Sequence, residues 1–274
     1  MTETSVGAGG VEARRFRGVP RLYGSAAAAT FAEAHAIVVG VGGVGSWAAE
    51  ALARSGVGAL TLIDLDHVAE SNINRQVHAL DDTLGMAKVQ AMRARIAAFH
   101  PGCQVEAVEA FVEPDGWVAL LERACDRQGR QRPLAVLDCC DQIAAKVAMA
   151  AWARRSRVPL VTVGAAGGKR YPERVEIDDL ARATHDPLLA RLRQQLRRRH
   201  GAPSQGPMEL AAVFSREPVA RPAADCPQVP DAFGPGASLS CHGYGSSVVV
   251  TATFGFCAAG WVLNQWAAGV KETL

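Results

Sequence analysis

The chain has 274 residues, of which 49% are apolar and 20% charged, and its formal net charge is +2. This composition is typical of a soluble globular protein, and it excludes nucleic-acid binding that depends on overall charge alone. The seven cysteines form no C-x-x-C pair, which argues against a disulfide scaffold or a four-cysteine zinc site and fits a reducing cytoplasm. Residues 1–13 are mostly small and polar without the pattern of a secretory signal, so we expect them to be disordered.

Short apolar runs alternate with helical patterns along the first part of the chain. The expected strands are 36–40, 59–64, 104–109, 134–138 and 159–163. The expected helices between them are 43–55, 85–100, 114–127 and 142–156. The second helix has an apolar face formed by Met86, Val89, Met92, Ile96 and Phe99. The alternation predicts an α/β fold with a doubly wound, mostly parallel, Rossmann-like sheet, which we expect as one domain at 14–168.

After the fifth strand the pattern changes. A short strand is expected at 174–177, and Asp186-Pro187 opens a helix rich in arginine. Residues 201–240 contain many prolines, so we expect a long irregular segment there. The last expected helix, 244–268, is apolar, and we interpret it as a buried or dimer-interface helix, with a membrane span as the less favoured alternative. Residues 169–274 would form a smaller C-terminal extension of the same globular unit.

A glycine-rich turn follows the first expected strand. Gly40, Gly42 and Gly45 have the spacing G-x-G-x-x-G before a helix, where glycine lets the backbone approach a phosphate and free N–H groups face it. Asp64 ends the second strand, at the position where an acidic residue meets a ribose. This part of the sequence suits an NAD site and an ATP site equally well.

The polar residues that follow favour ATP. Asn72, Asn74, Arg75 and Lys88 offer amide and cationic donors that suit the β- and γ-phosphates. Lys88 lies in the first turn of its helix, where a cation opposes the helix dipole. A phosphate partner therefore explains this lysine better than solvent does.

Two further sets of charged residues follow along the chain, a pair of aspartates and a helix of arginines. At the end of the fourth strand, Asp138 and Asp141 are spaced three apart, and we assign Mg²⁺ to Asp141 and a structural role to Asp138. The arginine-rich helix has no acidic residue, which favours contact with a phosphate backbone over a solvated face, with Lys169 and Arg170 as neighbours. The residues expected to contact that phosphate backbone are Arg191, Arg193, Arg197, Arg198 and Arg199.

These motifs resemble, in their order, those of the ubiquitin-activating-enzyme-like superfamily, whose bacterial members adenylate carboxylates. They are the Gly40–Gly45 loop, Asp64-x-Asp66, Ser71-Asn-Ile-Asn-Arg75, Lys88 and Asp138-x-x-Asp141. Within the superfamily, the chain is most similar to the tRNA threonylcarbamoyladenosine dehydratase family. That similarity lies in Arg21-Leu-Tyr-Gly24, Asn74-Arg-Gln-Val-His-Ala-Leu80 and Val250-Thr-Ala-Thr-Phe-Gly-Phe256.

The resemblance implies an ATP- and Mg²⁺-dependent enzyme. It would convert threonylcarbamoyladenosine beside the tRNA anticodon to its cyclic form by adenylating the threonyl carboxylate. Arg21, Arg75, Lys88 and Asp141 would be catalytic, with Arg21 reaching the triphosphate of the partner in a homodimer. Cys241 matches a cysteine linked to sulfur-relay proteins such as a cysteine desulfurase, although a structural thiol fits equally well. The implied nucleotide-binding residues are Gly40, Gly42, Gly43, Gly45, Asp64, Asp66, Ser71, Asn72, Asn74, Arg75 and Lys88.

Two alternatives remain at this point. Adenylation of the C-terminus of a small sulfur-carrier protein would use the same ATP residues, and only the missing cysteine pairs and the basic helix argue against it. An NAD(P)-dependent oxidoreductase or a nucleotide-binding scaffold would have no use for Arg75, Lys88 and Asp141. We therefore expect an adenylate-forming, tRNA-modifying enzyme.

Overall fold

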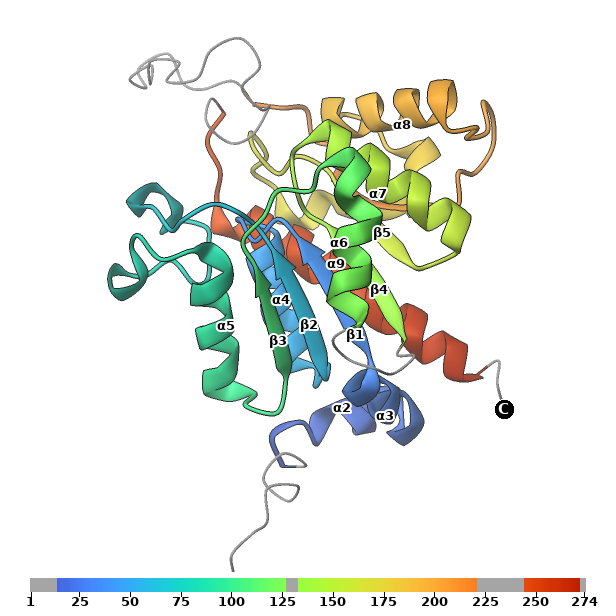
Figure 1. Cartoon of the computed structure of the whole chain (residues 1–274). Coiled ribbons are helices and arrows are strands. Elements are labelled where there is room, and N and C mark those ends of the chain that lie inside the picture. Colours follow the sequence, from blue (N-terminus) through green and yellow to red (C-terminus); the bar gives the residue numbers. More distant parts are fainter. Residues whose placement is uncertain (1–13, 127–132, 221–243, 272–274) are drawn as a thin grey trace, which may run out of the picture.

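The strands of this protein form a single sheet at its centre (Figure 1). The computed structural model describes residues 14–126, 133–220 and 244–271. In these residues the sheet has seven strands in the order β3-β2-β1-β4-β5-β7-β6, and every pair is parallel except β6 with β7. The strands are β1 (His35–Val39), β2 (Ala59–Ile63), β3 (Gln104–Val108), β4 (Leu134–Asp138), β5 (Leu160–Val163), β6 (Val175–Asp179) and β7 (Ala211–Ser215).

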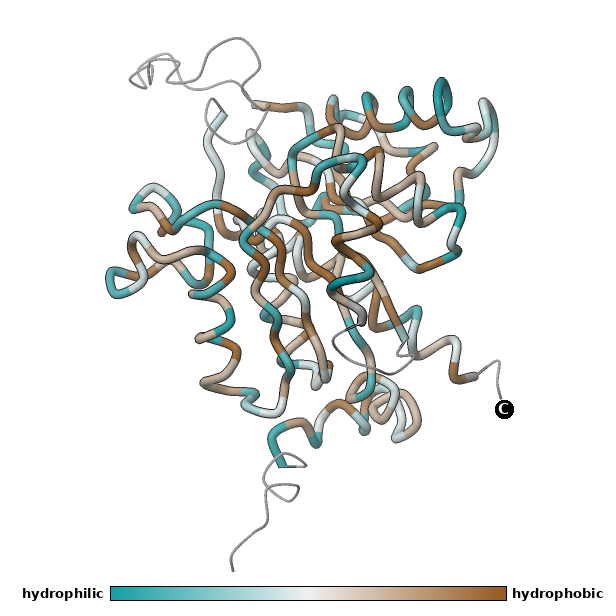
Figure 2. The backbone as a smooth tube through the Cα atoms, viewed as in Figure 1, coloured by the Kyte–Doolittle hydropathy of each residue, from teal (hydrophilic) through white to brown (hydrophobic). Residues whose placement is uncertain are grey.

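Helices cover both faces of the sheet. They are α2 (Gly18–Tyr23), α3 (Ser25–Glu33), α4 (Gly45–Arg54), α5 (Lys88–Phe99), α6 (Trp117–Asp126), α7 (Ile143–Ser156), α8 (Pro187–Arg199) and α9 (Val248–Lys271). In β1, Ala36 and Val38 pack with α3, α4, α5 and α9, while Ile37 and Val39 pack with α6, α7 and α8. Because successive strand residues point to opposite faces, one apolar strand serves two cores. Figure 2 shows this apolar centre and the hydrophilic outer turns of α8. The predicted doubly wound α/β fold is confirmed.

The strand order reverses between β1 and β4, and this switch point opens a crevice at the carboxyl ends of the strands. The glycine turn after β1 closely approaches the loop after β4. Gly40 has φ +84°, and a Cβ there would stand 2.9 Å from the backbone of Cys139 and Cys140. A Cβ on Gly45 would stand 1.8 Å from the carbonyl oxygen of Gly40. The glycine spacing is therefore a steric requirement of this turn.

Two sequence expectations about elements are wrong. The segment 201–240 was expected to be irregular, but residues 211–215 form β7, a buried strand between β5 and β6. Its apolar run is only five residues long and has prolines on both sides, so no periodicity shows it. The helix expected to begin at residue 85 begins at Lys88, and Met86 lies before it with 39% of its surface exposed. Residues 221–240 lie outside the described residues.

Helix α9 runs across one face of the sheet and packs along α4 (Figure 1). By length and composition it could cross a membrane, but a core helix passes the same test, and half of its apolar window is buried inside the protein. Trp47 meets Phe256 with ring centroids 5.8 Å apart, and Phe31 meets Trp266 at 6.3 Å. These contacts support its interpretation as a core helix. Its outer face still exposes Val249 and Phe256.

Candidate nucleotide-binding site

A cavity of about 220 Å³ lies at the carboxyl ends of the strands. The loops after β1 to β5 all contribute to its walls, as expected for a site at a topological switch point. It brings together eight of the residues that the sequence singled out: Gly40, Gly42, Gly43, Asp64, Asp66, Arg75, Lys88 and Asp141.

The Asp64 carboxylate holds the glycine turn in place. Its Oδ2 accepts a hydrogen bond from the backbone N–H of Val41 at 2.6 Å, and its Oδ1 accepts one from Asp66 at 2.9 Å. Burial raises the pKa of Asp64, while the nearby Lys88 and both backbone N–H groups lower it in part. A carboxylate has about four acceptor positions, so Asp64 keeps capacity for a ribose hydroxyl.

Lys88 is buried at the edge of the cavity as the first residue of α5. Its ammonium lies 2.7 Å from Oδ2 of Asp66, and the two side chains are 9% and 59% exposed. The well-exposed Asp66 compensates the lysine charge in the structure without a ligand. A phosphate group in the cavity could share or replace this partner.

The segment before α5 orients the Arg75 guanidinium. Its Nη1 donates to the carbonyl oxygen of Ser71 at 2.6 Å and to Oδ1 of Asn74 at 2.8 Å. Trp47 Nε1 donates to the Arg75 carbonyl oxygen at 2.9 Å, which ties this segment to α4. Asn74 Nδ2 donates to the carbonyl oxygen of Ser246, just before α9. Ser71 and Asn74 thus support Arg75 and do not line the cavity themselves.

Asn72 also lies outside the cavity lining. It is 8% exposed, and its Oδ1 accepts a hydrogen bond from the N–H of Ala69 at 3.1 Å. In this structure its side chain caps a short turn. Gly45 likewise lies behind the lining, at the first residue of α4.

Asp141 lies in the loop after β4, in the cavity wall. The described residues contain no group of three or more His, Cys, Asp or Glu that could hold a metal ion. Mg²⁺ typically binds one or two carboxylates together with substrate phosphates and water. A single carboxylate in a cavity that also contains Arg75 and Lys88 fits that chemistry, and a metal site built from protein ligands alone does not.

Below the cavity, Asp138 and Lys146 form a fully buried ion pair. Lys146 Nζ lies 3.0 Å from Asp138 Oδ1 and donates to the carbonyl oxygen of Val163 at 2.8 Å. Thr162 Oγ1 donates to Asp138 Oδ2 at 2.6 Å. Burial is the largest effect and lowers the pKa of Lys146, but the Asp138 carboxylate together with Cys140 and Cys139 raises it, and the net pKa is raised. This network joins β4 to β5 and gives Asp138 the structural role that the sequence suggested.

The two cysteines in the cavity wall, Cys139 and Cys140, remain protonated at neutral pH. Burial, followed by the negative charge of Asp138, raises the pKa of Cys139 to about 12 and raises that of Cys140 as well. A thiol reacts as its thiolate, so neither is a nucleophile here. Both side chains therefore act as packing residues at the end of β4.

Several lining residues were missed in the sequence. The loop after β3 contributes Phe111 and Val112, α9 contributes Thr251, and the loop after β5 contributes residues 164–167. Gln76 lines the cavity next to Arg75. The glycine-rich run after the fifth strand was a usable signal, because such loops meet the glycine turn at the same edge of the sheet.

Arg21 is far from the cavity of its own chain. It lies on α2, at the opposite end of the sheet (Figure 1), shortly after Phe16, which packs on His100. Its side chain is exposed. Cys241 lies outside the described residues.

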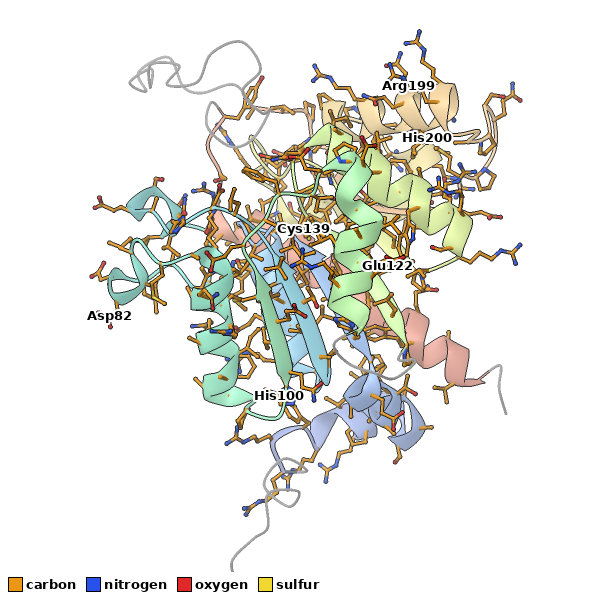
Figure 3. All side chains as sticks on the ribbon, in the orientation of Figure 1. Asp82, His100, Glu122, Cys139, Arg199 and His200 are labelled. Atoms are coloured by element: carbon orange, nitrogen blue, oxygen red, sulfur yellow. The ribbon has the colours of Figure 1, made fainter. Side chains whose placement is uncertain are left out.

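The arginines of α8 divide into two groups. Arg193 donates to the carbonyl oxygens of Leu180 and Ala183, and Arg197 donates to that of Pro203. The other three are exposed on the outer side of the helix, and Figure 3 shows Arg199 far from Cys139 at the cavity. They are Arg191, Arg198 and Arg199.

The expectation that Lys169 neighbours tRNA is wrong. Lys169 is 3% exposed, and its ammonium donates to backbone carbonyl oxygens of His185, Ser215 and Glu217. Burial lowers its pKa. Its role is to join three chain segments.

A doubly wound sheet with a glycine-rich turn and a charged cavity at the switch point defines a nucleotide-binding protein of the Rossmann-like class. The chain belongs to the ThiF family, which matches residues 15–209.

Among curated relatives, tRNA threonylcarbamoyladenosine dehydratase of Escherichia coli is 43% identical over 260 residues, 93% of this chain and 94% of that protein. Crystal structures of the E. coli tRNA N6-threonylcarbamoyladenosine dehydratase in complex with ATP and with AMP are also similar. They have TM-scores of 0.81 and 0.82 at 40% and 42% identity, covering 95% of this chain and 96% of theirs. Molybdopterin-synthase adenylyltransferase of E. coli is 36% identical over only 47% of this chain and 49% of that protein.

Proposed function

We propose that this protein is an ATP-dependent enzyme that closes the ring of threonylcarbamoyladenosine in tRNA. The observation that carries the proposal is one cavity that combines the glycine turn with Asp64, Arg75, Lys88 and Asp141. Relatives that match more than nine-tenths of the chain are dehydratases of this nucleoside, which supports the substrate. The structures of the E. coli relative with ATP and with AMP support ATP as the nucleotide and argue against an NAD-dependent reaction.

The free carboxylate of the substrate is a poor electrophile, and its reaction with ATP activates it. A free carboxylate would have to lose oxide, so one of its oxygens first attacks the α-phosphorus of ATP and pyrophosphate leaves. A nitrogen of the same substituent then attacks the acyl carbon and loses its proton. AMP leaves with the former carboxylate oxygen, which completes the loss of one water and closes a five-membered ring. Because this attack is intramolecular, proximity supplies much of the acceleration.

The side chains in the cavity bind and neutralise the nucleotide. The glycine turn and the start of α4 offer backbone N–H groups to phosphate. Asp64 is placed to accept from the ribose, while Arg75 and Lys88 balance the charge of the polyphosphate. Asp141 would hold Mg²⁺, which supplies further neutralisation of the phosphates when bound.

The exposed arginines of α8 fit the tRNA backbone. Arg191 and Arg198 are seven residues apart and therefore lie on one side of the helix. The end of α8 meets the end of α7, where Arg154 Nη1 donates to the carbonyl oxygen of His200 at 3.4 Å. The arginines at the end of α7 and at the end of α8 together enlarge this basic surface, which suits sequence-independent phosphate contacts.

A homodimer would complete the active site. Helix α9 is 24 residues, or about 36 Å, long, and it runs from the cavity, where Thr251 lines the wall, to α3, where Trp266 meets Phe31. A two-fold axis across its exposed apolar face would place α2 of one subunit beside the cavity of the other. Arg21, which cannot reach its own cavity, would then reach the partner's triphosphate.

Shared sites make a testable prediction. A mixture of Arg21→Ala and Lys88→Ala chains should recover activity, because mixed dimers contain one cavity with both residues intact. Each variant alone should be inactive. No recovery after subunit exchange, verified with differently tagged chains, would reject the contribution across the interface.

A cytoplasmic location follows from the tRNA substrate. Sulfur relay through Cys241, with a cysteine desulfurase or sulfur acceptor, stays a prediction. Adenylation of a sulfur-carrier protein is the weaker alternative, because the adenylyltransferase relative matches only about half of the chain.

The direct test supplies ATP and Mg²⁺ with either modified tRNA or a sulfur-carrier protein. AMP formation should require the tRNA, and mass spectrometry of its nucleosides should show a product lighter by one water. AMP formation with the carrier protein alone would overturn the proposal.

A further inference from the structure

One wall of the cavity has no evident role in nucleotide binding. The loop after β5, residues 164–167, exposes only glycine and alanine to the cavity. The backbone N–H groups of Ala166 and Gly167 have no acceptor among the described residues, although Ala166 is only 5% exposed. Buried backbone N–H groups are almost always paired. Gly167 is half-buried, so this cavity wall has one buried and one half-buried donor without an acceptor, and both point to an acceptor supplied by a ligand.

A second polar group in the same cavity also has no protein partner. Gln76 lines the cavity, is 5% exposed, and its Oε1 is buried without a hydrogen bond within the described part of the chain. A buried amide normally satisfies its oxygen, because leaving it unpaired costs about 1 to 3 kcal/mol. This side chain therefore indicates, independently of the loop, that the cavity is shaped for a polar ligand.

The strand order places the loop relative to the nucleotide. Asp64 follows β2, the glycine turn follows β1, and Asp141 follows β4. Strand β5 is next to β4 on the side away from β1 and β2. The loop after β5 thus lies beyond the phosphate-binding groups, on the side opposite the ribose position.

We propose that the loop 164–167 is the subsite for the acyl end of the substrate, which binds through the backbone N–H groups of Ala166 and Gly167. This inference rests on the proposed function. The two groups donate first to the threonyl carboxylate as it attacks the α-phosphorus. During ring closure, nitrogen attack pushes an electron pair onto the acyl oxygen, and the same groups stabilise that oxyanion. The pair returns as the bond to AMP breaks, and the attacking nitrogen gives its proton to solvent water.

Asp186 positions this loop. Its Oδ2 accepts from the N–H of Ala165 at 2.8 Å, and its Oδ1 accepts from the N–H of Leu189 at 3.0 Å, which caps α8. A Cβ on Gly164 would stand 2.1 Å from Asp186 Oδ2, so only glycine fits there. One buried carboxylate thus locks the acyl subsite to the helix that carries the exposed arginines.

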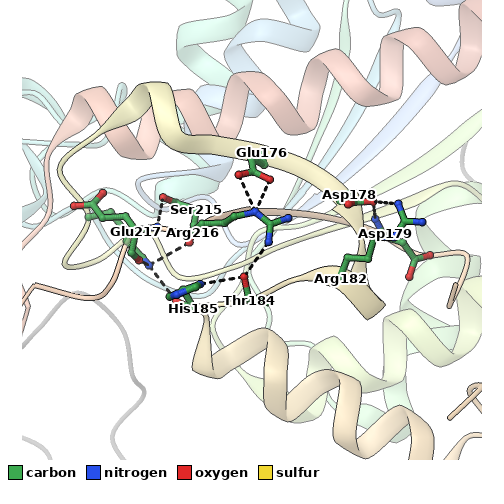
Figure 4. Close-up of polar contacts among 10 residues, drawn as sticks. Glu176, Asp178, Asp179, Arg182, Thr184, His185, Ser215, Arg216 and Glu217 are labelled. Atoms are coloured by element: carbon green, nitrogen blue, oxygen red, sulfur yellow. Dashed lines mark hydrogen bonds and ion pairs between the residues drawn. The ribbon is translucent and has the colours of Figure 1, made fainter. Parts of the chain in front are cut away.

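A second contact holds the same two segments together. Lys169, just after the loop, donates to the carbonyl oxygen of His185 at 3.1 Å and to that of Ser215 at 3.4 Å, two residues that Figure 4 labels. The loop and the start of α8 are therefore fixed to each other on both sides. A tRNA backbone bound to α8 would therefore have a fixed position relative to the acyl subsite.

Asp186→Asn tests the positioning role with little change in shape. Asparagine caps helices as well as aspartate does, but its amide can satisfy only one of the two backbone N–H groups. Asp179→Asn is the matched control. Asp179, labelled in Figure 4, also caps a short turn. It accepts from Ala181 at 2.8 Å and from Met208 at 2.9 Å, and it does not line the cavity.

In single-turnover reactions with ATP, Mg²⁺ and modified tRNA, Asp186→Asn should slow ring closure about tenfold to a thousandfold. The dissociation constants of ATP and tRNA should change less than twofold. More AMP should form than rings close, because a misplaced acyl-adenylate hydrolyses. Asp179→Asn should keep both the rate and the ratio of AMP formed to rings closed within twofold of the wild type, even if it lowers Tm as much as Asp186→Asn does.

Gly167→Val gives a second test if Asp186→Asn folds poorly. Gly167 has no positive φ, so its backbone conformation does not require glycine, and valine would fill the subsite. A rate within threefold of the wild type in a folded variant, or an equal loss of ATP affinity, would overturn the inference. Absence of tRNA-dependent AMP formation by the wild type would instead reject the proposed function.

Discussion

Lys146→Met should destabilise the protein by about 3 to 5 kcal/mol, because it leaves a buried carboxylate without its cation. Asp138 and Lys146 have no exposed side-chain surface, and their charged atoms are 3.0 Å apart. Methionine fills nearly the same space, so a cavity contributes little to the loss. Thr162 still donates to Asp138, but a hydroxyl does not neutralise the charge.

Urea unfolding at pH 7 measures this loss. The double variant Asp138→Asn, Lys146→Met removes both charges and should recover more than about 1 kcal/mol relative to Lys146→Met. Arg182→Met is the matched control, since the Arg182–Asp178 pair is 3.2 Å apart but its side chains are 67% and 30% exposed. It should cost less than about 1 kcal/mol. A similar small loss for Lys146→Met, or a double variant no more stable than the single one, would refute the reasoning.

Three further predictions concern pH, ATP and tRNA. Burial, then repulsion by Lys88 and Arg95, lowers the pKa of His78 from 6.5 to about 4. The contribution of His78 to the free energy of unfolding should thus be complete above pH 6.5 and fall by about 3 kcal/mol as the pH drops to 4. In urea unfolding at a series of acid pH values, His78→Leu should show a smaller decrease over this range. Lys88→Met should weaken ATP binding about tenfold to a hundredfold in calorimetry while sparing adenosine, and equal loss for both ligands would contradict its phosphate role. Arg191→Glu with Arg198→Glu should weaken tRNA binding and flatten its salt dependence, whereas Arg93→Glu on α5 should not.

The periodicity of the chain was enough to predict the core of the fold. Strands such as β1 and β4 are continuous apolar runs, because a parallel sheet is covered on both faces. The five residues of β7 were missed because tertiary pairing with β5 and β6, not local pattern, makes them a strand. The periodicity of a segment does not reveal its pairing with segments that are distant in sequence.

The site was predictable where a motif has a local cause. Gly40 is required by a turn, and Asp64 by its place at a strand end, so both could be predicted. The ion pair of Lys146 and the contact of Asp186 with the loop after β5 could not, because they depend on groups brought near by folding. Lys169 shows the opposite error, since a lysine beside an arginine was expected at the surface and is buried against carbonyl oxygens.

The central claim is that the substrate carboxylate attacks the α-phosphorus of ATP in the cavity lined by Arg75, Lys88 and Asp141. It can be tested most directly with tRNA whose threonyl carboxylate carries heavy oxygen, followed by mass spectrometry of the products of one turnover. The account predicts that the label appears in the phosphate of AMP, with unlabelled pyrophosphate. Label in inorganic phosphate, accompanied by ADP, would contradict it.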